Sequence, residues 1–215
     1  MKRLIVFDWD GTIVDSVSDI ISCKQSLALK HGLPLPDEKI IREVLGKPFK
    51  EAMAICFPAE SKEAQKLLEN DYHKLMKKSF FYSPLFTNVL STLIYLKSKG
   101  YILGVATSKY REEFDVDIKY HGLQDVFDIV ACGDEHTGKP DPAMLKFIIK
   151  QTNVPIEDTL FIGDTRTDIL FARNAGIDVI TVTYGAHSKA DLELANPDGF
   201  VDNFSEIVMR IDSYV

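Results

Sequence analysis

The sequence predicts an α/β protein in which a doubly wound parallel sheet carries a helical insertion after its first strand. Two observations support this prediction. Short apolar runs alternate with amphipathic stretches along most of the chain, an order typical of parallel βαβ units. Residues 17–81, in contrast, show helical patterns without strand-like alternation. We therefore expect a core formed by residues 1–16 and 82–215, and a helical cap formed by residues 17–81.

Five apolar runs are the candidate strands of the core. Each is short enough for a strand buried on both faces of a sheet. They cover residues 4–7, 101–106, 127–131, 159–162 and 179–182. Amphipathic stretches between them are expected to be helices, and they cover residues 87–99, 111–120, 142–151 and 167–174. Gly100 and Gly176 follow two of these stretches and are typical helix-ending residues.

The inserted segment is expected to be helical throughout. Residues 17–31 form the first helical pattern and end at Gly32. Asp37 is a candidate N-cap for a second helix, because its side chain can accept from a free backbone N–H. Residues 61–78 form a long pattern rich in Lys and Glu.

Composition limits the classes of partner. The chain has 215 residues and a net charge of −7, so it offers no attraction to nucleic acid or to anionic lipid. The first apolar run is too short for a signal peptide, and no run is long enough to cross a bilayer. The three cysteines form no CxxC pair. These features predict a cytoplasmic protein with reduced thiols that binds neither nucleic acid nor membrane. A monomer or homodimer is expected, and the sequence does not decide between them.

Polar residues follow several of the candidate strands. Asp8 and Asp10 follow the first strand, Thr107 and Ser108 the second, and Asp164 the fourth. Ligands bind at the carboxyl ends of the strands in open α/β sheets, so we expect these side chains to converge. Clustered carboxylates repel one another unless a cation holds them, and Mg²⁺ prefers such oxygen ligands and shares phosphate oxygens. The sequence therefore predicts a Mg²⁺ site at this edge of the sheet.

Two further charged residues are expected at the same edge. Lys139 lies beyond the third candidate strand, just before Pro140. Asp168 lies one helical turn after Asp164. Asp168 also suits the positive end of its own helix, so a structural role for it remains open.

These residues match a known set of motifs. Residues 8–12 (Asp-Trp-Asp-Gly-Thr) match the DxDGT signature of the haloacid dehalogenase superfamily. Residues 107–108 (Thr-Ser), 139–140 (Lys-Pro) and 163–168 (Gly-Asp-Thr-Arg-Thr-Asp) resemble its second, third and fourth motifs. Residues 138–142 resemble the branch that contains phosphoglycolate phosphatases and β-phosphoglucomutases. The resemblance covers nearly the whole chain and implies a Rossmann-like core with a small helical cap.

The resemblance implies a role for each matching acid and for the lysine. Asp8 would attack phosphorus to form an aspartyl-phosphate, while Asp10 would protonate the leaving oxygen and later deprotonate water. Lys139 would neutralise charge on Asp8 and on the transferring group. Asp8, Asp164 and the backbone carbonyl of Asp10 would bind Mg²⁺. Asp168 would anchor a metal-bound water or hold Lys139.

The resemblance also implies a phosphate-binding set and a substrate class. Thr107, with backbone N–H groups near Gly11 and Ser108, would bind phosphoryl oxygens. The implied substrate is a small phosphorylated metabolite, a phosphate monoester with phosphoglycolate as the first candidate. Lys47 and Arg42 in the cap are candidates for contact with the leaving group, and solvated surface charges are an equal alternative for both.

Other activities of the superfamily remain open. A sugar-phosphate phosphomutase, a pyrophosphatase and a nucleotidase share the catalytic residues. A phosphonate hydrolase would need a cap lysine that forms a Schiff base, for which Lys24, Lys30 and Lys47 are candidates. A dehalogenase is disfavoured by Asp10. A binding or regulatory protein without catalytic activity is the alternative from another class of function. It is disfavoured because the four motif acids, Asp8, Asp10, Asp164 and Asp168, are all present.

Overall fold

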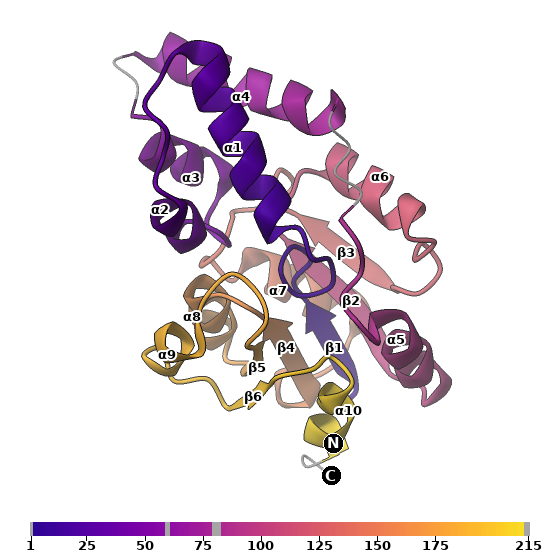
Figure 1. The fold of residues 1–215 in the computed structure, drawn as a ribbon. Coiled ribbons are helices and arrows are strands. Elements are labelled where there is room, and N and C mark those ends of the chain that lie inside the picture. Colours follow the sequence, from indigo (N-terminus) through magenta and orange to yellow (C-terminus); the bar gives the residue numbers. More distant parts are fainter. Residues whose placement is uncertain (1, 59–60, 79–82, 213–215) are drawn as a thin grey trace.

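The computed structural model describes residues 2–58, 61–78 and 83–212, and it has the predicted α/β architecture (Figure 1). Within these residues six parallel strands form one sheet in the order β3-β2-β1-β4-β5-β6. The strands are β1 (Leu4–Phe7), β2 (Ile102–Thr107), β3 (Ile129–Cys132), β4 (Thr159–Gly163), β5 (Asp178–Val182) and β6 (Gly199–Val201). The doubly wound sheet predicted from the sequence is thus confirmed.

The first strand lies in the middle of the sheet. Every residue of β1 is buried, which explains why its sequence is a continuous apolar run rather than an alternating one. Phe7, its last residue, is in register with Val105 of β2 and Ile162 of β4. The residues that follow β1, β2 and β4 therefore emerge side by side.

Helices cover both faces of the sheet. One face packs against α5 (Val89–Ser98), α6 (Arg111–Tyr120) and α10 (Glu206–Asp212). The other face packs against α7 (Ala143–Thr152), α8 (Arg166–Ala175) and α9 (Lys189–Glu193). A short 3-10 helix, Ile156–Asp158, precedes β4. The two apolar layers hold the strand ends, and hence the polar residues after them, in fixed positions.

Four helices form a separate group beyond the carboxyl end of β1 (Figure 1). They are α1 (Val17–His31), α2 (Glu38–Glu43), α3 (Phe49–Cys56) and α4 (Lys62–Lys78), and they share their own apolar cluster. Gly32 ends α1 with a φ of 64°, a left-handed conformation that suits glycine. Asp37 caps α2 by accepting from the backbone N–H of Lys39. The expected boundary between residues 81 and 82 lies outside the described residues.

Sequence and structure differ mainly at the weaker elements. The third strand begins at Ile129 rather than Phe127, because the Asp128 carboxylate accepts from the Leu103 backbone N–H. Strand β6 has only three residues and was not expected from the sequence.

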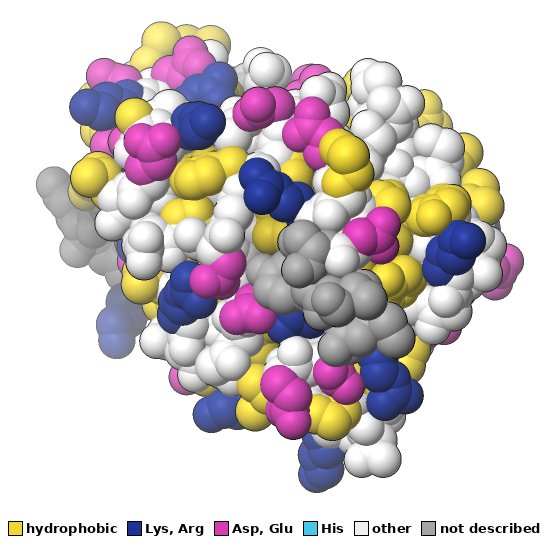
Figure 2. Space-filling view, turned by 90° about the horizontal axis from the view of Figure 1, so that it is seen from below, with side chains coloured by type: hydrophobic (Ala, Val, Ile, Leu, Met, Phe, Trp, Pro, Cys, Tyr) yellow, Lys and Arg dark blue, Asp and Glu magenta, His cyan; other side chains and the backbone are white. Residues whose placement is uncertain are grey.

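None of the described helices is long and apolar enough to cross a bilayer. On the face shown in Figure 2, the described Lys and Arg side chains are interleaved with Asp and Glu.

Candidate active site

The strand order reverses beside β1, which places a crevice between the carboxyl ends of β1 and β4. Asp8 follows β1 and Asp164 follows β4, so these two acids meet at that point. Asp168 reaches the same place from the first turn of α8. Carboxylate oxygens of the three residues all lie within 4.8 Å of one another. The topology alone thus assembles an acid cluster from distant parts of the sequence.

One lysine lies among these acids. Lys139 is fully buried, and its Nζ lies 2.8 Å from Oδ1 of Asp8 and 2.7 Å from Oδ1 of Asp168. Asp164 and Asp168 are fully buried too, and Asp8 is only 5% exposed. A single ammonium group cannot balance three carboxylates. The cluster therefore carries an excess of negative charge away from water, where such an excess is costly.

The electrostatics of the site follow from this imbalance. Burial raises the pKa of Asp8 to about 7, although the Lys139 ammonium opposes the shift. Burial, followed by the charges of Asp168 and Asp8, raises the pKa of Asp164 well above its ordinary value. Burial alone would lower the pKa of Lys139, but Asp168 and Asp8 hold it above the usual range. The acids accordingly favour either bound protons or an additional cation.

The surroundings of Asp164 fit a small cation. Its Oδ1 accepts from the Thr12 hydroxyl at 3.0 Å, and its Oδ2 accepts from the Ala186 backbone N–H at 2.7 Å. A Cβ atom at Gly11 would lie 2.2 Å from the Asp164 carboxylate, and one at Gly185 would lie 2.3 Å from its Cβ. Gly11 also has a φ of +79°, which few other residues adopt. The backbone therefore closes tightly around a carboxylate held in one orientation, and the buried acids could hold a metal cation.

Asp168 has two structural tasks at once. Its Oδ1 binds Lys139, while its Oδ2 accepts from both the backbone N–H and the hydroxyl of Thr165. The Thr165 hydroxyl in turn accepts from the Asp168 backbone N–H, which completes a capping box at the start of α8. Asp168 therefore makes both the contact at its helix end and the contact with Lys139, and its role beside a metal-bound water stays a prediction.

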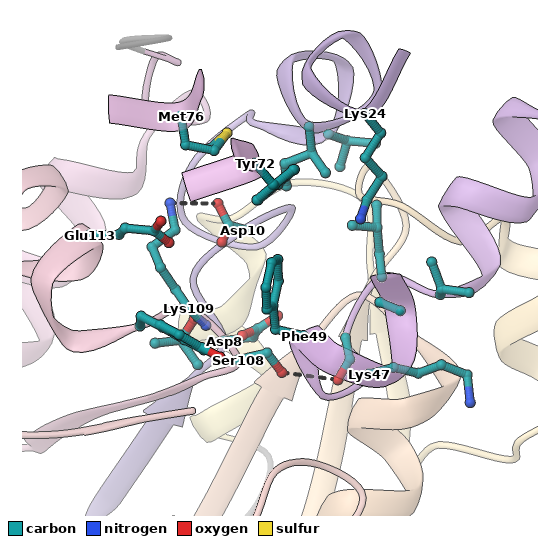
Figure 3. A pocket seen from close by; sticks show the side chains of 18 residues that line it. Asp8, Asp10, Lys24, Lys47, Phe49, Tyr72, Met76, Ser108, Lys109 and Glu113 are labelled. Carbon is teal, nitrogen blue, oxygen red and sulfur yellow. Dashed lines mark hydrogen bonds and ion pairs between the residues drawn. The ribbon is translucent and has the colours of Figure 1, made fainter. Parts of the chain in front are cut away.

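Asp10 lies beside this cluster rather than within it. Its Oδ1 accepts from the Ser16 hydroxyl at 2.7 Å and lies 3.3 Å from Nζ of Lys109. Lys109 also contacts Asp117 at 2.5 Å. The Ser16 hydroxyl and the Lys109 ammonium group thus hold the carboxylate of Asp10. Asp10 lines the cavity between the sheet edge and the helices α1–α4 (Figure 3).

The expected phosphate-binding residues are close to the acids, but they differ in what they offer. Thr107 ends β2, is buried, and its hydroxyl accepts from the Lys109 backbone N–H. The Ser108 hydroxyl donates to the Gly46 carbonyl at 3.1 Å (Figure 3). The backbone N–H of Gly11 already donates to the Val14 carbonyl at 2.9 Å. In this structure Gly11 provides room beside Asp164 rather than a free donor.

A cavity of about 100 Å³ separates the sheet edge from the helices α1–α4. Its wall on the sheet side includes Asp8, Asp10, Thr107 and Ser108. The wall formed by the four helices and their loops is mainly apolar and includes Val17, Ile20, Lys24, Val44, Leu45, Phe49, Ala52, Tyr72 and Met76. The two sides of the cavity therefore have opposite chemical character.

The two basic residues considered for the leaving group do not bring their charges to Asp8. Lys47 lines the cavity, but its Nζ pairs with Glu51 at 2.5 Å, and the side chain runs away from Asp8 (Figure 3). Arg42 pairs with Glu38 at 2.9 Å and lines a different hollow. The Arg42 carbonyl accepts from Nε2 of His187 in that hollow.

Several site residues were not assigned a role from the sequence. Lys109 directly follows the second motif, so its charge was a usable signal for a contact with Asp10. Thr12 lies in the first motif and Ser16 shortly after it, and their hydroxyl groups donate to Asp164 and Asp10. Ala186 contributes a backbone N–H to Asp164, and such a contact leaves no mark in the residue type.

Comparisons with known proteins agree with this geometry. The model of the family described as haloacid dehalogenase-like hydrolase matches residues 5–182. The chain is 33% identical over 214 residues to "Probable phosphatase IndB" of Dickeya dadantii, covering 97% of this chain and 93% of that protein. It is 31% identical over 220 residues to a phosphoglycolate phosphatase of Pasteurella multocida, covering 98% of each.

Solved structures show the same fold over nearly the whole chain. A predicted phosphoglycolate phosphatase from Haemophilus somnus has a TM-score of 0.89 at 26% identity, covering 97% of each chain. A haloacid dehalogenase-like family hydrolase from Streptococcus pneumoniae has a TM-score of 0.85 at 27% identity, covering 97% of this chain and 98% of that one. On the family match and the acid cluster at β1 and β4, the chain belongs to the haloacid dehalogenase-like hydrolase family.

Proposed function

We propose that this protein is a Mg²⁺-dependent phosphatase that hydrolyses a small phosphate monoester through an aspartyl-phosphate on Asp8. The observation that carries the proposal is the buried Asp8 carboxylate, 2.8 Å from Lys139 and clustered with Asp164 and Asp168. Attack on phosphorus needs a positioned nucleophile and positive charge around the transferring group. This cluster provides the positioned nucleophile, and with a bound cation it also provides the positive charge.

The proposed reaction has two steps. An oxygen of Asp8 attacks phosphorus, the bond from phosphorus to the ester oxygen breaks, and Asp10 gives that oxygen a proton. A water molecule then attacks phosphorus, Asp10 takes its proton, and the bond to Asp8 breaks to release phosphate. Lys139 remains protonated and neutralises charge on Asp8 throughout. Asp8, Asp164 and the Asp10 backbone carbonyl would hold Mg²⁺, which when bound neutralises phosphoryl oxygens.

Residues 17–81 are proposed to be a cap over this site. Hydrogen bonds and ion pairs join the helical group to the core at well-separated points: Ser108 to the Gly46 carbonyl, and His73 to Glu113 at 2.6 Å. A cover of this kind excludes water from the reacting groups. Its apolar inner wall supports that role.

Phosphoglycolate is the first candidate substrate. The relatives bearing that name cover almost the whole chain. A sugar-phosphate phosphomutase, a pyrophosphatase and a nucleotidase are the alternatives. A cytoplasmic monomer or homodimer is proposed, and Cys23, Cys56 and Cys132, all free and buried, suit a reducing compartment.

The test is phosphate release with and without Mg²⁺ from phosphoglycolate, glucose 1-phosphate, pyrophosphate and adenosine monophosphate. Asp8→Asn should lose at least about 10⁴-fold in kcat, because the nucleophile is removed. Asp125→Asn is the matched control, since that aspartate is exposed and lies outside the site. Substantial turnover by Asp8→Asn would refute the covalent mechanism. Failure of the wild-type protein to hydrolyse any of these esters would favour a binding protein instead.

A further inference from the structure

Lys24 is a buried lysine on the helical wall of the cavity. The residue is 3% exposed and projects from α1. Its Nζ lies 3.6 Å from the sulfur of Met53 and 5.0 Å from the centre of the Tyr72 ring. A thioether and an aromatic face are weak partners for an ammonium group. Buried charges in proteins are normally paired with an opposite charge, so the position of Lys24 needs an explanation.

The other lysines that line the cavity are paired. Lys47 contacts Glu51, and Lys109 contacts both Asp10 and Asp117. Across residues 2–58, 61–78 and 83–212, Lys24 alone among the cavity-lining lysines has no carboxylate within ion-pair distance. The structure therefore contains one cavity-lining lysine whose amino group has no described carboxylate as a partner, and burial lowers the pKa of that amino group, so a bound anion would stabilise its charged form.

The position of Lys24 suits a ligand in the cavity. Lys24 lines the cavity from the helical side, behind Phe49 and Tyr72 in the view of Figure 3, whereas Asp8 and Asp10 line it from the sheet side. Phe49, Tyr72 and other apolar groups form the surrounding wall, and Lys24 itself is almost fully buried. An anion brought into such a low-dielectric wall is attracted more strongly than in water. A phosphate ester with its phosphoryl group at Asp8 would extend its leaving group toward this wall.

We propose that Lys24 determines substrate specificity by binding an oxyanion on the leaving group, either a carboxylate or a second phosphoryl group. This inference rests on the proposed function, because that function places the phosphoryl group at Asp8 and the leaving group opposite. The preferred substrates are then short phosphate monoesters with a second anionic group. One anionic group would lie near Asp8 and the other near Lys24, because both residues line the same cavity.

The experiment compares three esters in wild type, Lys24→Met and Lys47→Met. Phosphoglycolate carries a carboxylate, propane-1,3-diol bisphosphate carries a second phosphoryl group, and ethyl phosphate has an uncharged leaving group. We expect Lys24→Met to lower kcat/KM for the preferred anionic ester by roughly 100-fold, mainly through KM. Ethyl phosphate should change by less than about threefold, and Lys47→Met, which removes a paired lysine, should change all three by less than about threefold.

Each other outcome overturns the inference. An equal loss on charged and uncharged esters would make Lys24 a structural residue of the helical wall. A wild-type enzyme that hydrolyses ethyl phosphate as well as the charged esters would refute the role of Lys24 but leave the phosphatase proposal intact. Borohydride-dependent labelling of Lys24 with phosphonoacetaldehyde would assign it to imine formation instead. If Lys24→Met fails to fold, Lys24→Gln takes its place.

A binding measurement separates this inference from the proposed function. Calorimetry would compare phosphoglycolate and propane-1,3-diol bisphosphate binding to Asp8→Asn and to Asp8→Asn combined with Lys24→Met. Weaker binding of either anion by roughly 100-fold in the double variant supports the inference even if no ester is hydrolysed. Equal dissociation constants in the two proteins would refute it.

Discussion

The two sides of the cavity are built by different means. On the sheet side, the acids follow neighbouring strands, and backbone groups such as the Ala186 N–H fix Asp164. On the helical side, the wall is a set of apolar side chains around Lys24. The comparison teaches that the strand ends set the chemistry, whereas side chains from α1–α4 set what fits beside it. The strand ends are rigid and charged, whereas the wall formed by α1–α4 is apolar and open to variation.

The two sides also differ in how they are held. The acid cluster is enclosed by glycines that leave no space for a Cβ, and by the two apolar layers of the sheet. The helical group has an apolar cluster of its own and touches the core through separate contacts such as Ser108 with Gly46. We expect the sheet side to tolerate almost no change, and the helical side to adapt.

The largest expected effect on stability comes from Lys139, the lysine that lies among the three acids of the cluster. Lys139→Met leaves the buried carboxylates of Asp8 and Asp168 without their cationic partner, and should destabilise the protein by about 3–5 kcal/mol. Activity should fall roughly 10²–10³-fold. Urea unfolding and steady-state kinetics measure the two effects. Lys97→Met, which removes an exposed pair with Asp128, is the control and should cost less than about 1 kcal/mol. A wild-type-like Lys139→Met would contradict the electrostatic description of the sheet side.

The second prediction concerns pH in the metal-free protein. Burial raises the pKa of Asp8 from 3.8 to about 7, so the folded state binds more protons than the unfolded state in that range. Stability therefore falls as pH rises from about 4 to about 7, and the raised pKa of Asp164 acts in the same direction. Thermal unfolding in EDTA should show a lower Tm at about pH 8 than at about pH 5.

Added Mg²⁺ should raise Tm more at the higher pH, because the acids must lose protons to bind it. Asp8→Asn should flatten the dependence on pH in EDTA, because the variant has no carboxyl group to titrate there. A metal-free Tm that rises over this range in the wild-type protein would contradict the prediction.

A smaller effect is expected from the backbone around Asp164. A Cβ added at Gly185 would lie 2.4 Å from Oδ2 of Asp164, so Gly185→Ala should displace the carboxylate. We expect Mg²⁺ affinity, measured by calorimetry, to fall about tenfold. Gly199→Ala is the matched control, because the nearest atom to its added Cβ would be 3.8 Å away. Unchanged affinity in Gly185→Ala would mean that the backbone can move away there.

The smallest effect is expected from Lys47→Ala. Its ammonium pairs with Glu51 and points away from Asp8, so kcat and KM should change by less than about threefold for the best substrate. A larger rise in KM would restore Lys47 as a contact of the leaving group and would show that the helical side rearranges when substrate binds.

Much of the fold followed from the sequence, because strongly buried strands have unmistakable patterns. Residues 4–7 are a continuous apolar run and form β1 between two other strands. Strand β6 has three residues, too few for any periodic signal. The expected division at residues 81 and 82 and the individual catalytic roles stay predictions.

The part of the candidate site that depends on buried strands could also be predicted from the sequence. Asp8 and Asp164 were expected to meet because parallel strands align their carboxyl ends, and their carboxylates do lie together. Lys24 could not be singled out, since its helix contains another lysine and burial depends on how α1 packs against α3 and α4. Pairing of Lys47 with Glu51 likewise depends on the rotamers adopted in the fold.

The buried thiols have a practical consequence for observing this molecule. Burial raises the pKa of Cys23 and of Cys132 to about 12, and raises that of Cys56 as well, so all three should react slowly with maleimides. Cysteines introduced at exposed positions, such as Leu67 on α4 and Leu90 on α5, could then carry a fluorescent donor and acceptor without removal of the native thiols. Energy transfer between these dyes would measure, molecule by molecule, whether the helical group moves relative to the sheet.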